Sequence, residues 1–217
     1  MVDPRDDGKP ARSGAGAKAP RSDGGPATSE RVAKRPATYK DLRAVPEGQF
    51  AEILDGELVV MPAAGLPHSL AVTRIVVSVD PFSREPGGPG GPGGWTVLGA
   101  PQLHLRADWP SPDVVGWRLS RMRRLPATAH TRVVPDWICE VLSPGTVKKD
   151  RVVKARIYAK AGVGHYWIVD PKKRTLEVMK LAGGEWARVA RYKGKEKVRV
   201  EPFEEMEIEL GRWWGSS

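Results

Sequence analysis

One acidic residue occupies a position where a hydrophobic residue is expected. The run from Asp136 to Ser143 reads Asp-Trp-Ile-Cys-Glu-Val-Leu-Ser, and its apolar content predicts a buried strand. Because alternate side chains of a strand share a face, Glu140 lies on the same face as Ile138 and Leu142. An unpaired carboxylate in such a place costs several kcal/mol. The fold must therefore supply Glu140 with a metal, a cation or a proton.

Two further charged residues lie at comparable places. Asp113 stands in Ser-Pro-Asp-Val-Val, at the start of another apolar run, and Lys154 lies on the helix predicted after the Glu140 strand. Charged groups that gather at strand ends often mark a functional site. Two acids that converge on one divalent ion, with a lysine beside them, suit metal-assisted phosphodiester hydrolysis.

Each of these residues also has an ordinary structural interpretation. Asp113 follows two nearby prolines and fits a turn, whereas Glu140 fits a salt bridge with Arg156 or Lys154. Lys154 fits a solvated helix position, because Asp150 lies one turn earlier in a favourable acid-before-base spacing. The site hypothesis depends on the three residues taken together.

Other candidates are weaker. Glu57 either joins the site as an additional acid or completes the turn at Asp55-Gly56, and the two interpretations carry equal weight. His68 precedes a predicted helix and fits a helix-start or surface position. No pair of histidines has zinc-ligand spacing. Tyr158 is interpreted as core or hydrogen-bonding support. Cys139 is interpreted as a small buried hydrophobic residue, and a single cysteine suits a reducing cytoplasm.

Composition predicts one folded domain and a tail. Residues 1–36 are rich in Gly, Pro, Ala and Ser without hydrophobic periodicity, which predicts a disordered basic tail, and residues 37–217 form a single domain. The net charge is +9, of which residues 1–40 carry +4 and the remainder +5. A polyanion is a plausible partner on this charge, but the folded part is only mildly basic. No segment is long enough to span a membrane, so a cytoplasmic protein is expected.

The apolar pattern predicts a mixed α/β or α+β domain with a central sheet. Asp55-Gly56 between two apolar segments predicts a hairpin, and Gly162 predicts a helix end. The expected helices are a short one from Thr38, one over 69–83 and one over 150–161. The expected strands cover 95–105, the Asp113 run, the Glu140 run, 165–170, 175–181, 186–192 and 206–210.

Basic residues suggest where a phosphate backbone would bind. The stretch from Arg118 to Arg132 is interpreted as a basic helix and loop at the surface. No base-reading motif is visible, so these residues would contact phosphates rather than read sequence. The candidate contacts are Arg118, Arg121, Arg123, Arg124, Lys148 and Lys149.

The chain resembles the Uma-two family of restriction endonucleases, a branch of the PD-(D/E)XK nuclease superfamily. The resemblance covers roughly residues 38–212, and its most specific part runs from Glu140 to Pro171. The matching pieces are residues 52–58, Pro67-His68, Pro112-Asp113, residues 140–144, Asp150 with Lys154, residues 158–163 and residues 166–171.

The resemblance implies a restriction-endonuclease-like core, with a mixed central sheet flanked by helices. It implies that Asp113 and Glu140 hold Mg²⁺, or Mn²⁺ in its place, and that a lysine positions or activates the attacking water. The residue two after Glu140 is Leu142, so the usual lysine is absent and Lys154 takes its role. Glu57 matches the acid at the front of the family pattern.

The expected mechanism is hydrolysis of a nucleic-acid phosphodiester, in DNA rather than RNA by preference. The backbone carbonyl of Val141 is a further candidate metal ligand, and a homodimer is a possibility taken from other nucleases. One alternative is an inactive nuclease-fold protein that binds nucleic acid or regulates. Another is a structural protein whose buried acids form ion pairs.

Overall fold

The computed structural model describes residues 35–61 and 63–215. The tail predicted over 1–36 therefore falls outside the described residues except for Arg35 and Pro36. Its disorder, and the division into a tail and a single domain, stay predictions.

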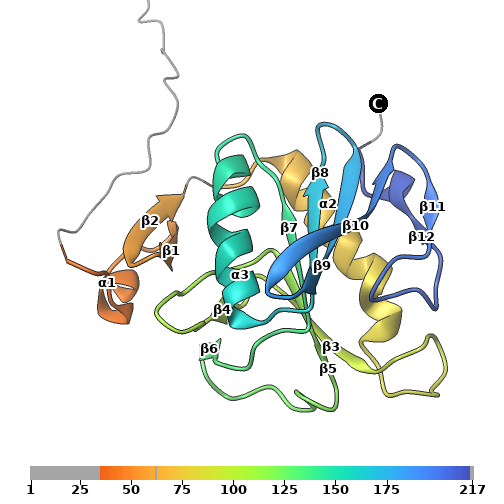
Figure 1. The fold of residues 1–217 in the computed structure, drawn as a ribbon, viewed down its shortest axis with the longest axis horizontal. Helices are drawn as coiled ribbons and strands as arrows, with labels where there is room; N and C mark the ends of the chain where they lie inside the picture. Colours follow the sequence, from red (N-terminus) through yellow and green to blue (C-terminus); the bar gives the residue numbers. More distant parts are fainter. Residues whose placement is uncertain (1–34, 62, 216–217) are drawn as a thin grey trace, which may run out of the picture.

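The body is built on a six-stranded mixed sheet with the order β10-β9-β8-β7-β5-β3 (Figure 1). Only β7 and β8 pair in parallel, and the other neighbours are antiparallel. This confirms the expected mixed α+β architecture with a sheet at its centre. The strands are β3 (Trp95–Gly99), β5 (Val114–Arg118), β7 (Trp137–Val141), β8 (His165–Asp170), β9 (Thr175–Ala182) and β10 (Glu185–Lys193).

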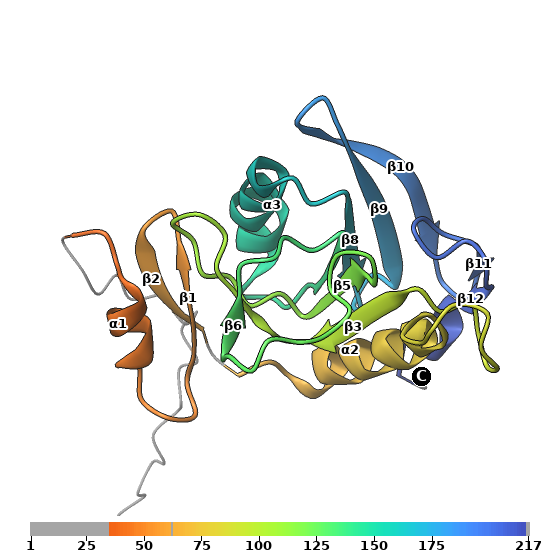
Figure 2. The same cartoon turned by 90° about the horizontal axis from the view of Figure 1, so that it is seen from below.

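Helices cover both faces of this sheet. The helix α2 (Leu66–Val79) packs Ala71, Ile75 and Val79 against one face, together with the C-terminal segment. The π-helical segment η2 (Lys149–Lys154) continues directly into α3 (Ala155–Ala161), which covers the other face (Figure 2). Among the described helices, none combines the length and the apolar character that crossing a membrane requires.

The hairpin predicted at Asp55-Gly56 is confirmed. It joins β1 (Phe50–Leu54) and β2 (Glu57–Met61) in a small sheet of their own, next to α1 (Tyr39–Arg43). Both turn residues have positive φ, 53° for Asp55 and 76° for Gly56, as a type I′ turn requires. Two backbone hydrogen bonds between Ile53 and Trp109, of 3.2 and 2.8 Å, attach the hairpin to the loop before β5.

The remaining elements are short. They are η1 (Asp80–Phe82), β4 (Gln102–Leu103), β6 (His130–Thr131), β11 (Lys197–Val198), β12 (Ile208–Glu209) and η3 (Leu210–Arg212). The strand expected over 95–105 is thus interrupted at Ala100, whose φ is +46°, and the one expected over 206–210 is only two residues long. The helix expected over 150–161 ends as predicted, because Gly162 takes the left-handed conformation with φ of 86°.

The basic helix expected between Arg118 and Arg132 is wrong. A turn closes on the carbonyl of Arg118, which accepts hydrogen bonds from the backbone N–H groups of Arg121 (2.9 Å) and Met122 (3.0 Å). Residues 123–129 then run exposed and irregular to β6. Leu119, Met122 and Leu125 recur at helical spacing, but Pro126 disfavours the helical conformation of the residue before it and has no N–H to donate, so a helix cannot continue through the segment. The surface position expected for this segment is correct.

A substitution of Phe203 tests the packing of the hydrophobic core on the α2 side of the sheet. It is fully buried and its ring lies 4.7 Å from Phe82, 4.9 Å from Trp95 and 4.8 Å from Trp137, between ring centres. Phe203→Ala should lower the free energy of unfolding by about 3–5 kcal/mol, measured by urea denaturation. Phe50→Ala is the matched control, because Phe50 is 61% exposed and its loss should cost below about 0.5 kcal/mol. Equal midpoints for both variants would contradict this view of the core.

Candidate active site

The pairing of β5 with β7 brings the two predicted acids together. The two strands are antiparallel, with Val114 opposite Cys139, so β5 begins where β7 ends. Asp113 therefore lies beside Glu140 at one edge of the sheet, and its Oδ2 accepts a hydrogen bond of 2.7 Å from the backbone N–H of Val141. Glu140 is 2% exposed and lies on the α3 face with Ile138 and Leu142, as the alternation predicts.

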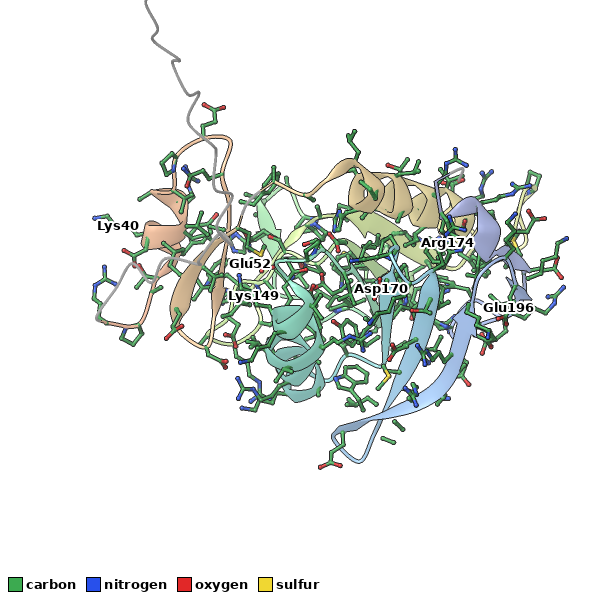
Figure 3. The ribbon with its side chains drawn as sticks, turned by 90° about the horizontal axis from the view of Figure 1, so that it is seen from above. Lys40, Glu52, Lys149, Asp170, Arg174 and Glu196 are labelled. Atoms are coloured by element: carbon green, nitrogen blue, oxygen red, sulfur yellow. The ribbon has the colours of Figure 1, made fainter. Side chains whose placement is uncertain are left out.

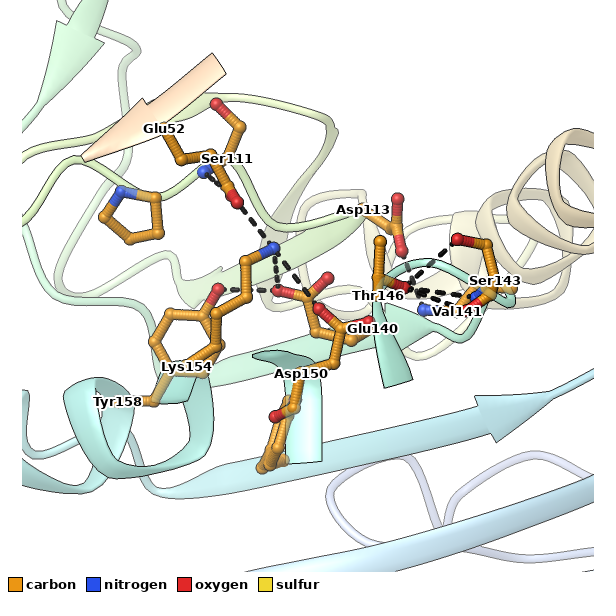
Figure 4. A network of polar contacts seen from close by, with 12 residues as sticks. Glu52, Ser111, Asp113, Glu140, Val141, Ser143, Thr146, Asp150, Lys154 and Tyr158 are labelled. Carbon is orange, nitrogen blue, oxygen red and sulfur yellow. Dashed lines mark hydrogen bonds and ion pairs between the residues drawn. The ribbon is translucent and has the colours of Figure 1, made fainter. Parts of the chain in front are cut away.

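Lys154 reaches the same place from η2. Its side chain is 3% exposed, and its Nζ lies 3.0 Å from Glu140 Oε1 and 2.9 Å from Glu52 Oε1 (Figure 4). Asp150 Oδ1 is 3.7 Å from the same nitrogen. The spacing of four residues between Asp150 and Lys154 thus places both on the inner side of the helix, and not on a solvated face as one interpretation held.

Glu52 is the acid that the sequence interpretation missed. It is fully buried, and its Oε1 also accepts a 2.7 Å hydrogen bond from the backbone N–H of Ser111. Its other oxygen, Oε2, is buried without a hydrogen-bond partner. Glu57, the predicted candidate of the same hairpin, is exposed at the start of β2. The sequence did contain a pattern that could have identified Glu52, namely the alternation already used for Glu140. Glu52 shares a strand face with the buried Leu54.

Tyr158 and His68 support the two acids from opposite sides of the sheet. Tyr158 is fully buried and donates a 2.6 Å hydrogen bond to Glu140 Oε1, which agrees with its expected supporting role. His68 lies in the first turn of α2, and its Nε2 is 3.2 Å from Asp113 Oδ1. The sequence placed His68 correctly at a helix start but did not connect it with Asp113, because the contact depends on how α2 packs.

Burial and crowding shift the protonation of this cluster. Burial raises the pKa of Glu140 well above its ordinary value, although Lys154 opposes the shift. For Lys154, burial lowers the pKa, but Glu140, Glu52 and Asp150 outweigh it and leave the pKa well above its ordinary value. Burial also raises the pKa of Asp150 to about 6. Lys154 is therefore held as a cation among more carboxyl groups than it can neutralise.

The donor atoms suit a hard divalent cation. The acids supply only oxygen, they outnumber the single lysine, and one buried carboxylate oxygen, Glu52 Oε2, has no partner. Mg²⁺ prefers oxygen ligands and keeps several waters, so it needs only one or two carboxylates. Within the described residues, no group of three or more His, Cys, Asp or Glu side chains is arranged to hold a metal. A site of two carboxylates completed by water is compatible with both observations.

The predicted phosphate contacts divide between the two edges of the sheet. Lys148 and Lys149 lie at the acid edge, just after β7. Arg118 lies at the other end of β5, five residues from Asp113, which is about 17 Å along a strand. Its guanidinium stacks over Trp95 at 4.1 Å from the ring centre. Arg121, Arg123 and Arg124 follow it in the exposed loop at that far edge.

The fold matches known proteins. A crystal structure titled as a "putative nuclease" from Anabaena variabilis aligns with a TM-score of 0.65 at 19% sequence identity, covering 82% of this chain and 99% of that chain. At this identity the likeness shows the fold: a mixed central sheet with few helices. No curated protein matches the chain.

The family follows from the sequence of the same region. The model of the Uma-two family, described as "Putative restriction endonuclease", matches residues 36–211. The chain belongs to this family, which confirms the resemblance inferred from its motifs.

The raised pKa of Asp150 gives a pH-dependent prediction. The folded-state pKa is about 6, against about 3.9 in an unfolded chain. Because the pKa of Asp150 is raised on folding, the contribution of this group to stability is fully present below about pH 4. That contribution is lost as the pH rises through about 6. Asp150→Asn mimics the protonated acid at every pH. In chelator-treated buffer it should gain up to about 3 kcal/mol over the parent between pH 4 and pH 8.

Urea denaturation at several pH values measures this difference. Asp80→Asn is the control, because the Asp80 side chain is 57% exposed and its replacement should show no such trend. A gap between Asp150→Asn and the parent that stays constant, or narrows as the pH rises, would contradict the prediction.

Proposed function

We propose that this protein is a divalent-metal-dependent endonuclease that hydrolyses phosphodiester bonds of nucleic acid, with DNA as its substrate. The observation that carries the proposal is the buried Lys154 Nζ at 3.0 Å from Glu140 Oε1, at the sheet edge where Asp113 begins the neighbouring strand. Membership of a family described as "Putative restriction endonuclease" supports it.

Asp113 and Glu140 are the proposed ligands of Mg²⁺ or Mn²⁺, with the backbone carbonyl of Val141 as a further oxygen. When bound, such an ion polarises the phosphate and lowers the pKa of a coordinated water. The chain holds both carboxylates ready for this role. The N–H of Val141 and the His68 ring fix Asp113, and the Tyr158 hydroxyl fixes Glu140.

Lys154 acts as a fixed positive charge in this proposal. Because Glu140 and Glu52 raise its pKa well above the ordinary value, it stays protonated and does not serve as a general base. Its N–H groups orient the attacking water and stabilise negative charge that develops on the phosphate. Glu52 holds the ammonium group in place from the hairpin, in the position that the sequence interpretation gave to Glu57.

A second candidate rests on the contacts that the acids already make. Asp113 and Glu140 both have hydrogen-bond partners within the chain, as in a structural ion-pair cluster. An inactive nuclease-fold protein that binds nucleic acid would look the same in this respect. The enzyme needs metal to act on DNA, whereas this alternative binds DNA without metal and leaves it intact.

Nicking of supercoiled plasmid in Mn²⁺ or Mg²⁺ tests the catalytic roles. Glu140→Gln and Lys154→Met should each lower the nicking rate by a factor of about 100 or more, because the first removes a proposed metal ligand and the second removes the positive charge that stabilises the transition state. Loss of the buried Lys154 charge also destabilises the fold, so rates are compared where circular dichroism shows both variants folded. Equal nicking by the parent and both variants would identify a contaminant as the nuclease.

Glu57→Gln serves as the matched comparison. It removes one negative charge from the exposed side of the same hairpin and should keep most of the activity. If Glu57→Gln lost as much nicking activity as Glu140→Gln, Glu57 would belong to the active site after all.

Metal binding is tested separately from catalysis by thermal denaturation. At Mn²⁺ concentrations about 100 times the dissociation constant, the parent should gain about 2.7 kcal/mol. Asp113→Asn and Glu140→Gln should remove most of this gain, whereas Glu47→Gln, outside the site, should not. A Mn²⁺ response that survives in both site variants would place the ion elsewhere.

A further inference from the structure

The edge of the sheet that carries the acids also carries lysines from three separate segments, most of them exposed. Lys148 and Lys149 follow β7, Lys172 and Lys173 form the turn between β8 and β9, and Lys193 and Lys195 lie at the end of β10 and just beyond it. The pairing places all three segments at one edge, because Val141 lies opposite Val169, Asp170 opposite Thr175, and Thr175 opposite Lys193. Figure 3 shows Glu52, Lys149 and Asp170 along this edge.

Among residues 35–61 and 63–215, most of these lysines have no acidic partner. Within the described residues, Lys173 is the one member of the group with a carboxylate within 4 Å of its ammonium, Asp170 at 3.7 Å. Lys148, Lys172, Lys193 and Lys195 are also solvent exposed. In the part of the chain that the structure describes, Glu196 accepts a 3.0 Å hydrogen bond from the backbone N–H of Lys193 but makes no ion pair with these lysines, so positive charge continues from the acid cluster across β8 and β9 to β10.

The arginines at the opposite edge differ from these lysines because several of them contact other side chains of the protein. Arg121 is 2.7 Å from Asp136, and Arg123 is 3.0 Å from Glu85, between charged atoms. Arg118 stacks on Trp95. Arg121 and Arg123 border an open pocket of about 430 Å³ that the length of β5 separates from Asp113. Asp136 and Glu85 thus neutralise two of these arginines within the protein, and the arginines lie away from the proposed site of cleavage.

We propose that duplex DNA lies along the acid edge of the sheet and that its phosphates are held by the lysines after β7, between β8 and β9, and at the end of β10. This inference rests on the proposed function and adds the path of the substrate. Three inter-strand steps separate β7 from β10, about 14 Å. A strand of duplex DNA presents about four phosphates over that length. The lysine row therefore matches a stretch of phosphate backbone that ends at the acid cluster.

The test compares two triple variants with equal changes of charge. Lys148→Gln, Lys172→Gln and Lys193→Gln together remove one exposed lysine from each segment of the acid edge. Arg121→Gln, Arg123→Gln and Arg124→Gln together form the control at the far edge. Binding of a labelled duplex is measured by fluorescence anisotropy at several salt concentrations in EDTA, so that no cleavage occurs, and thermal denaturation verifies folding.

The lysine variant should bind roughly tenfold or more weakly than the parent at moderate salt, and its salt slope should fall by about one for each lysine lost. The arginine variant should bind like the parent. Parent-like binding by the lysine variant, a larger loss in the arginine variant, or no duplex binding by the parent would each overturn the inference.

The two proposals fail separately. If the lysine variant loses duplex binding but the parent does not nick plasmid in Mn²⁺, hydrolysis fails and the DNA path stands. If the parent nicks plasmid while the lysine variant binds duplex normally, the proposed nuclease activity is supported and the proposed path of the DNA is wrong.

Discussion

The ammonium group of Lys154 between the carboxylates of Glu140 and Glu52 joins three parts of the molecule. It connects η2 with the end of β7 and with the β1–β2 hairpin, which belongs to a sheet of its own. Breaking a buried ion pair by removing one partner costs about 3–5 kcal/mol, because the other charge is left uncompensated. This contact therefore contributes both to the position of the hairpin on the body and to the geometry of the candidate site.

The parallel pairing of β7 and β8 explains why this contact forms at the sheet edge. A parallel connection must cross over the sheet, and here η2 and α3 make the crossing from the end of β7 back to the start of β8. The crossover begins at the end of β7, so its first turns lie over Glu140. The antiparallel β5 begins at the same edge and adds Asp113. One arrangement of strands thus collects groups that are distant in sequence.

This edge of the sheet has two neighbouring regions of opposite charge. The buried acids exceed the charge of Lys154, which favours a cation in the cluster, whereas exposed lysines continue along β8, β9 and β10. These carboxylates weaken the attraction of the lysines for a polyanion, and a bound cation would relieve that repulsion. The proposed nuclease is therefore expected to bind DNA in EDTA and to bind it more tightly with a divalent metal.

The sequence by itself determined the local features: the buried strand around Glu140, the Asp-Gly hairpin, the helix end at Gly162 and the family. Each depends on residues near one another in the chain, where periodicity and turn chemistry act directly. The missing helix after Arg118 shows that apolar spacing over a few residues does not suffice for a helix where a proline, here Pro126, follows. Only the tertiary structure decided that Glu52 and not Glu57 meets Lys154, that His68 reaches Asp113, and that the lysines share an edge with the acids while the arginines do not. The reason is that strand order and register are set by pairing between distant segments of the chain. The direction of each strand then decides at which edge of the sheet the basic residues next to it lie.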